Sequence, residues 1–323
     1  MRQNFHQKKS RKAFSLIELS ILITVISVII AAMVSVSASH IANEKNKAGN
    51  DNINIIYKAL GKYLLANKKL PCPASLLDVR SSSSTYATAL SATDCVGSGV
   101  YQSTSSTNLI YGMVPTQTLG LNYDSAEDAF GNKIIYIVDK RLTTTTSNSF
   151  ETNVGNSTLI SVTGISSVSN ALFVLMSRGA NASGAYNANS SSAPAASSDS
   201  NELSNDASGI SDNSYPTVAT STFDSTFVQS NSSTNFDDVV FYKTEEEMFN
   251  DFDAWWLIPC TSASSTETLY GTSITWPKAY ANQIVTANNN CPSGWTSGLT
   301  TPTKKCGVKG VWGSVINGCT IDP

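Results

Sequence analysis

An apolar run from Phe14 to Ser39 is the feature that most constrains what this chain can fold into. The run contains one charged residue, Glu18, close to its start. A helix rises about 1.5 Å per residue, and a bilayer core about 30 Å thick needs roughly 20 apolar residues. The run therefore predicts a transmembrane helix.

The segment before this run is basic. It carries five lysines and arginines and no acid: Arg2, Lys8, Lys9, Arg11 and Lys12. Positive charge beside an apolar helix favours the cytoplasmic side of a membrane. We therefore expect a single-pass membrane protein with its N-terminus in the cytoplasm.

The junction between the basic segment and the apolar run has a recognisable pattern. Small Ala13, then Phe14, then Glu18 inside the run resemble the leader of type IV prepilins and type II secretion pseudopilins. The resemblance implies that a prepilin peptidase cuts between Ala13 and Phe14, that Phe14 is then methylated, and that the apolar helices bundle into a filament. The family usually has glycine where this chain has Ala13.

The carboxylate of Glu18 has its own physical significance. An ionised carboxylate inside a bilayer costs at least about 2.5 to 3.5 kcal/mol, so such a residue normally has a partner or a function. The amine that the cut creates on Phe14 of a neighbouring subunit is the natural partner. In the alternative, a plain signal anchor, Glu18 reaches toward the cytoplasmic headgroups.

Charge and histidine content exclude several function classes. Without the five leader cations, 16 lysines and arginines stand against 24 acids, and a net charge of about −8 argues against binding nucleic acid through bulk charge. The two histidines, His6 and His40, both lie outside the expected ectodomain. Ser-His-Asp, Cys-His and His-ligated zinc sites would each lack a required residue there, so we expect no enzyme.

The chain beyond the apolar run predicts an α+β fold, in which the long N-terminal helix packs on an antiparallel sheet as in pilins. Apolar residues at helical spacing continue the helix as far as residue 69: Ile53, Ile56, Leu60, Tyr63 and Leu64. A turn that leads into a strand is expected at 128–138 and a further strand at 171–179, and both resemble segments of the major pseudopilins. The predicted parts are a leader (1–13), an assembly helix (14–69), a periplasmic head (70–258) and a C-terminal module (259–323).

A polar stretch interrupts the head at about 180–235. It is rich in serine and asparagine, has no lysine or arginine, and has few large apolar side chains before Tyr215. Such a composition buries too little apolar surface to offset the entropy of ordering, so we expect a disordered surface insertion.

An acidic pair, Asp237 and Asp238, directly follows this insertion and precedes an apolar strand. The pair resembles the acidic end of the calcium loop of the major pseudopilin. That resemblance implies a Ca²⁺ ion held by both carboxylates, with further oxygen ligands to complete the six to eight that calcium takes. The alternative is a solvated acidic turn, and we expect no other cofactor.

All six cysteines lie beyond the apolar run, and their even number fits disulfides in an oxidising compartment. We predict a Cys72–Cys95 disulfide, which closes a serine-rich loop and is worth about 3 kcal/mol. The alternative is that Cys72 and Cys95 pair with the C-terminal cysteines.

The four remaining cysteines lie in the C-terminal module, where 291–298, 306 and 310–319 look like a sushi (complement control) module. Four cysteines admit three connectivities. The resemblance implies the pairs Cys260–Cys306 and Cys291–Cys319, with Trp312 in the small core between them.

These features predict a structural subunit, minor or at the tip, of a type IV pilus or type II secretion pseudopilus. Its expected partners are prepilin peptidase, other pilin or pseudopilin subunits, and the inner membrane. The rival interpretation is a membrane-anchored cell-surface adhesin or binding protein that does not polymerise.

Overall fold

The computed structural model describes fifteen stretches of the chain: 16–81, 83–91, 95–103, 108–143, 150, 153–154, 160–192, 199–205, 220–221, 225–233, 236–260, 264–292, 295–296, 301–307 and 310–321. The side chains of 31–43, 46, 220–221, 295–296, 317 and 320–321 are not described. The chain divides into two compact units, Met1–Ala48 and Gly49–Pro323, and each is described by itself. The expected processing residues, Ala13 and Phe14, lie outside the described residues.

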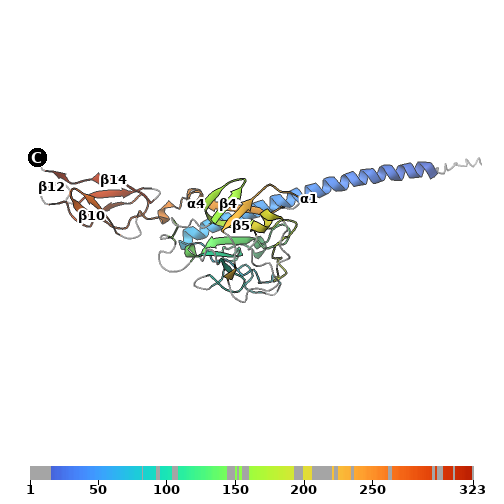
Figure 1. Cartoon of the computed structure of the whole chain (residues 1–323), viewed down its shortest axis with the longest axis horizontal. Coiled ribbons are helices and arrows are strands. Elements are labelled where there is room, and N and C mark those ends of the chain that lie inside the picture. Colours follow the sequence, from blue (N-terminus) through green and yellow to red (C-terminus); the bar gives the residue numbers. More distant parts are fainter. Residues whose placement is uncertain are drawn as a thin grey trace, which may run out of the picture. The chain divides into compact units, whose positions relative to one another are not determined.

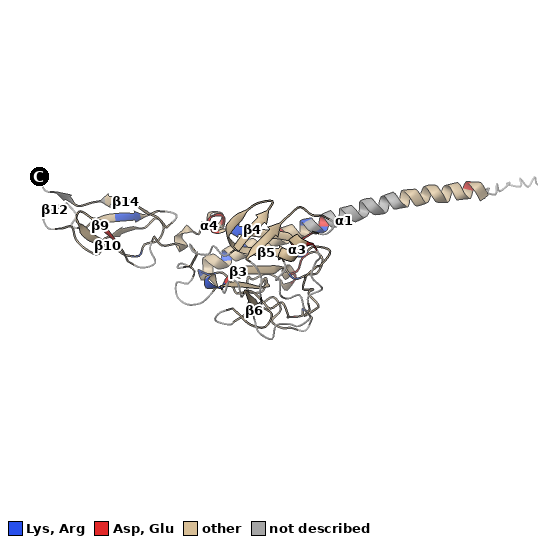
Figure 2. Cartoon of the chain, viewed as in Figure 1, with Lys and Arg blue, Asp and Glu red and all other residues tan. Residues whose placement is uncertain are grey.

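Helix α1 runs from Leu16 to Asn67. Its described first part, Leu16–Ile30, is exposed at every residue and carries Glu18 as its one charge (Figure 2). Among the side chains that the structure describes, no helix offers a stretch both long and apolar enough to cross a bilayer. The predicted transmembrane helix and the predicted inner-membrane location are contradicted by this finding.

The second unit is built mainly of strands (Figure 1). Its largest sheet has eight strands in the order β6-β1-β2-β3-β5-β4-β7, and β8 also pairs with β5. The strands are β1 (Tyr101–Ser103), β2 (Leu109–Met113), β3 (Ile135–Asp139), β4 (Ile160–Gly164), β5 (Val168–Ser177), β6 (Thr220–Ser221), β7 (Thr226–Gln229) and β8 (Val239–Thr244). Short 3-10 helices lie at Tyr123–Ala126, Lys140–Leu142 and Trp255–Leu257.

The predicted fold class, an antiparallel sheet under a transmembrane helix, is wrong for the sheet as well. The sheet is mixed, because β6 pairs with β1 and β7 pairs with β4 in parallel. Both parallel strands come from the stretch 180–235 that composition had predicted to be disordered. Parts of that stretch instead join the fold, with Tyr186, Glu202 and Phe227 buried.

Apolar side chains of the central strands form the core. Strands β2 and β3 and the second half of β5 are buried at every position, which agrees with their runs of β-branched and aromatic residues. Residues of α1 in the same unit belong to this core: Ile53, Ile56, Leu60 and Leu64 are at most 2% exposed. The ring of Tyr57 contacts those of Phe173 on β5 and Phe241 on β8.

Helix α4 (Glu245–Phe252) follows β8 directly and begins with a capping box. The hydroxyl of Thr244 accepts a hydrogen bond from the N–H of Glu247, and the carboxylate of Glu247 accepts one from the N–H of Thr244. This is the helix start that threonine followed by three acids predicts.

The C-terminal residues form three small sheets. In the first, β9 (Ser265–Leu269) pairs with β10 (Thr272–Trp276). In the second, β13 (Thr303–Cys306) lies between β11 (Ile284–Thr286) and β14 (Trp312–Asn317) and pairs with both. In the third, β12 (Trp295–Thr296) pairs with β15 (Thr320–Ile321). Their buried cluster is centred on Trp276, together with Ile274 and Ala287. Trp312, the expected core residue, is only partly buried and packs beside Trp276 with 6.2 Å between ring centroids.

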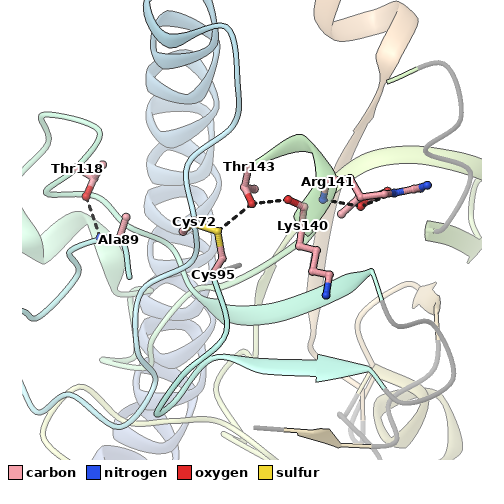
Figure 3. Close-up of a disulfide and its surroundings, with 8 residues drawn as sticks. Cys72, Ala89, Cys95, Thr118, Lys140, Arg141 and Thr143 are labelled. Carbon is pink, nitrogen blue, oxygen red and sulfur yellow. Dashed lines mark hydrogen bonds and ion pairs between the residues drawn. A yellow bond between two sulfur atoms is a disulfide. The ribbon is translucent and has the colours of Figure 1, made fainter. Parts of the chain in front are cut away.

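Three disulfides connect the six cysteines: Cys72–Cys95, Cys260–Cys306 and Cys291–Cys319. These are the pairs that the sequence predicted. Figure 3 shows the first of them beside Thr143, whose hydroxyl donates to the carbonyl oxygen of Lys140 (2.8 Å) and lies 2.9 Å from Cys95 Sγ.

Candidate metal centre

Three carboxylates meet where the polar stretch 180–235 joins the sheet. Asp237 and Asp238 immediately precede β8, and Glu202 lies on the short helix α3 (Ser200–Asn205). One oxygen of each carboxylate lies within 4.8 Å of the others. Glu202 and Asp238 are buried, at 1% and 6% exposed, and Asp237 is partly buried. The acidic pair found in the sequence is therefore two thirds of a larger cluster.

Sequence reasoning missed Glu202 because its surroundings read as disordered. A local signal was nevertheless present, since Asp199 can cap a helix that begins at the next residue. In the structure, Asp199 Oδ1 accepts hydrogen bonds from the N–H groups of Asn201 and Glu202. This cap starts α3 and places Glu202 in its first turn.

Backbone N–H groups hold the carboxylate of Asp237. Its Oδ2 accepts hydrogen bonds from the N–H groups of Ala180 (2.7 Å) and Asn181 (2.8 Å). The chain can approach so closely because Gly179 precedes them. Gly179 has φ +63°, and a Cβ atom at this position would lie 2.4 Å from Asp237 Cγ. A side chain is thus excluded at Gly179 both by backbone conformation and by space.

Glu202 shares these neighbours. Its Oε1 accepts hydrogen bonds from Asn181 Nδ2 (2.6 Å) and from the N–H of Asp237 (3.2 Å). Asn181 places a neutral amide beside these acids. Here it contributes donors to two of the acids, whereas an aspartate would add a fourth negative charge.

Asp238 faces a buried arginine. Arg178 is 1% exposed, and its Nη1 lies 3.4 Å from Asp238 Oδ2. The same oxygen accepts a hydrogen bond from Asn205 Nδ2 at 2.9 Å. Arg178 Nη2 also donates to the carbonyl oxygen of Asn205 (2.6 Å) and to the hydroxyl of Tyr111 (3.2 Å). The guanidinium therefore joins β5, β2, α3 and the start of β8.

Carboxylate oxygens of the cluster remain available on Glu202 and Asp237. Glu202 Oε2 and Asp237 Oδ1 are buried and accept no hydrogen bond within the described part of the chain. Among the described residues, Arg178 supplies one positive charge against three carboxylates, which is a formal excess of two negative charges. Burial raises the pKa of Asp237, the neighbouring Glu202 adds to that rise, and the N–H groups of Asn181 and Ala180 oppose it.

These features fit a hard divalent cation. Buried carboxylate oxygens without hydrogen-bond donors are expensive, and oxygen ligands with an excess of negative charge are what calcium selects. Glu202, Asp237 and Asp238 would hold such an ion. The ion would supply charge neutralisation and would crosslink the segments that carry them.

Ser177, the last residue of β5, hydrogen-bonds to an acid outside the cluster. Its hydroxyl donates to Asp128 Oδ2 at 2.8 Å. Asp128 Oδ1 accepts from the N–H groups of Phe130 and Asn132, and Asn132 Nδ2 donates to the carbonyl oxygen of Gly179. The Asp128–Asn132 turn thus holds the carbonyl oxygen of Gly179 through Asn132. Asp128 itself is not one of the three acids of the cluster.

The remaining residues singled out in the sequence are not part of this centre. Glu18 is exposed on α1 in the other unit. The six cysteines are all engaged in disulfides. Comparison of the chain with protein-family models, curated proteins and solved structures found no match.

Proposed function

We propose that this chain is a structural subunit, minor or at the tip, of a type IV pilus or type II secretion pseudopilus. Prepilin peptidase would process it at Ala13–Phe14. The observation that carries the proposal is the first part of α1, which is apolar on all sides and exposed throughout: Leu16 is 85% exposed, Val28 70% and Ile17 69%.

Such a surface calls for partners. A helix that is hydrophobic all round is normally buried, and exposed apolar patches of this extent are rare on monomers. Helices of the same kind from neighbouring subunits would cover Leu16–Ile30 in a bundle. Glu18 would then lie among apolar side chains, where a carboxylate requires a positive partner. The amine of a neighbour's processed Phe14 would supply that charge and set the register.

Mutation of Glu18 tests this assembly. We expect Glu18→Gln to reduce incorporation into sheared filaments at least tenfold, because the amide loses the charge while it keeps the shape. Glu44→Gln, the same change at an exposed position of the same helix, should leave incorporation unchanged. Full incorporation of the Glu18 variant would refute the proposal and favour the rival, a binding protein that does not polymerise.

Intact mass and N-terminal sequencing test the processing step independently. In cells with prepilin peptidase, we expect a chain that begins at methylated Phe14. The chain should begin at Met1 in cells without the peptidase. A chain that begins at Met1 in both would refute processing.

We further propose that the head binds calcium at Glu202, Asp237 and Asp238. The support is the pair of buried oxygens, Glu202 Oε2 and Asp237 Oδ1, that lack donors among the described residues. Titration of the metal-stripped full chain with Ca²⁺, followed by calorimetry, should give one saturable site that Glu202→Gln weakens at least tenfold. Asp51→Asn, an equal charge change at an exposed position of α1, should bind as the parent chain does.

A further inference from the structure

Helix α3 and strand β7 attach to the head through the same polar groups. Asn205, the last residue of α3, is fully buried. Its side-chain amide faces Val228 of β7: Oδ1 accepts from the N–H of Val228 (2.7 Å), and Nδ2 donates to its carbonyl oxygen (3.0 Å). The side-chain amide of Asn205 thus makes the two hydrogen bonds that the backbone of a neighbouring strand would make.

This contact lies at the end of the sheet. Strand β7 is the last in the strand order and pairs with β4 on one side. The N–H and C=O of Val228 that meet Asn205 belong to its other side, which is the open edge. An uncovered edge leaves backbone donors and acceptors to solvent or to other chains. Within the described residues, docking of α3 therefore covers the open edge of β7 at Val228.

Apolar burial contributes little to that docking. Among the six residues of α3, the single large apolar side chain is Leu203, which is 43% exposed. The attachments are polar instead: Asn181 and the N–H of Asp237 bond Glu202, while Arg178 and Asp238 bond Asn205. Three of the residues in this group are carboxylates in mutual proximity. Electrostatics thus decides whether α3 stays in place.

We infer that a divalent cation at the metal centre controls the docking of α3, through Glu202, and thereby the covering of β7. The inference rests on the calcium binding proposed above. With the cation bound, the excess of two negative charges disappears, and Glu202 is held to Asp237 and Asp238. Without it, Glu202 is the acid that can leave, because Asp237 and Asp238 are fixed by β8 whereas α3 is a short helix with little apolar contact.

Hydrogen exchange on the metal-stripped full chain tests this coupling. Calcium should slow exchange in peptides covering α3 and Thr226–Gln229 at least tenfold, and most at the N–H of Val228. Exchange in β3 should not change, because β3 lies in the core of the sheet. Glu202→Gln should abolish the calcium effect, and Asp51→Asn should retain it.

The outcomes separate the inference from the proposal beneath it. Calcium binding in the titration with unchanged exchange in α3 and β7 would overturn the inference and leave the site intact. Absence of binding would overturn both. Equal protection of α3 and β7 without calcium would overturn the need for a cation.

Discussion

Replacing Gly61 with alanine should destabilise the protein, whereas the same substitution at Gly49 should stabilise it. Both glycines lie on α1, and alanine is favoured over glycine in a helix by about 1 kcal/mol. At Gly49 a new Cβ would meet no heavy atom of the described residues within 4 Å, so the full gain should appear. At Gly61 the Cβ would lie 2.1 Å from Cζ of Phe252.

The ring of Phe252 cannot move away freely, because it packs edge-on against Tyr57 with 5.2 Å between ring centroids. Overpacking of this kind costs about 1 to 3 kcal/mol. After the helix gain is subtracted, Gly61→Ala should lower the free energy of unfolding by up to about 2 kcal/mol. Urea denaturation followed by tryptophan fluorescence measures both variants.

A double-mutant cycle identifies the cause. Phe252→Leu removes the rigid ring, so Gly61→Ala in that background should lose most of its penalty. If Gly61→Ala stabilises the parent chain as much as Gly49→Ala does, the ring of Phe252 does not limit the space at Gly61.

Two further predictions concern stability. Burial lowers the pKa of Lys133 to about 8, although its ammonium donates to the carbonyl oxygens of Leu76 and Ser190. The unfolded chain then binds more protons than the folded chain above pH 8, so the free energy of unfolding should rise from pH 8 to 9.5 in urea titrations. Lys133→Met should reduce this dependence on pH. An unchanged dependence on pH in the variant would contradict the role of Lys133. Replacing Cys260 and Cys306 with serine opens a loop of 46 residues and should destabilise the C-terminal strands by about 4 kcal/mol, seen as rapid proteolysis after residue 260 while the head stays resistant. Equal resistance of both parts would contradict that estimate.

Local patterns in the sequence predicted the parts of the fold that depend on local physics. The runs of β-branched residues around Ile135 and Val174 became the buried strands β3 and β5. Thr244 followed by three acids became the start of α4. The Cys72–Cys95 disulfide was predicted, and the two C-terminal pairs are those that the resemblance to a sushi module implied.

The parts that were missed depend on partners far away in the chain. Strand β7 has only four residues, and its parallel partner β4 lies more than sixty residues earlier. Glu202 can be buried because Asn181 and the backbone N–H of Asp237 hydrogen-bond to its carboxylate. Such a contact cannot be predicted from composition. Trp276 and not Trp312 fills the C-terminal core, since five tryptophans look alike until strand pairing places them.

The parallel pairing of β4 with β7 has a consequence during synthesis. Ser161 pairs with Thr226, which the ribosome adds 65 residues later. Synthesis proceeds at about 5 to 20 residues per second, so this edge of β4 stays without its partner strand for roughly 3 to 13 seconds. During that interval its backbone groups are open to other nascent chains. Closely spaced ribosomes on one mRNA bring such nascent chains together. We therefore expect the yield of this protein to fall with closer ribosome spacing, even when the folded protein resists heating.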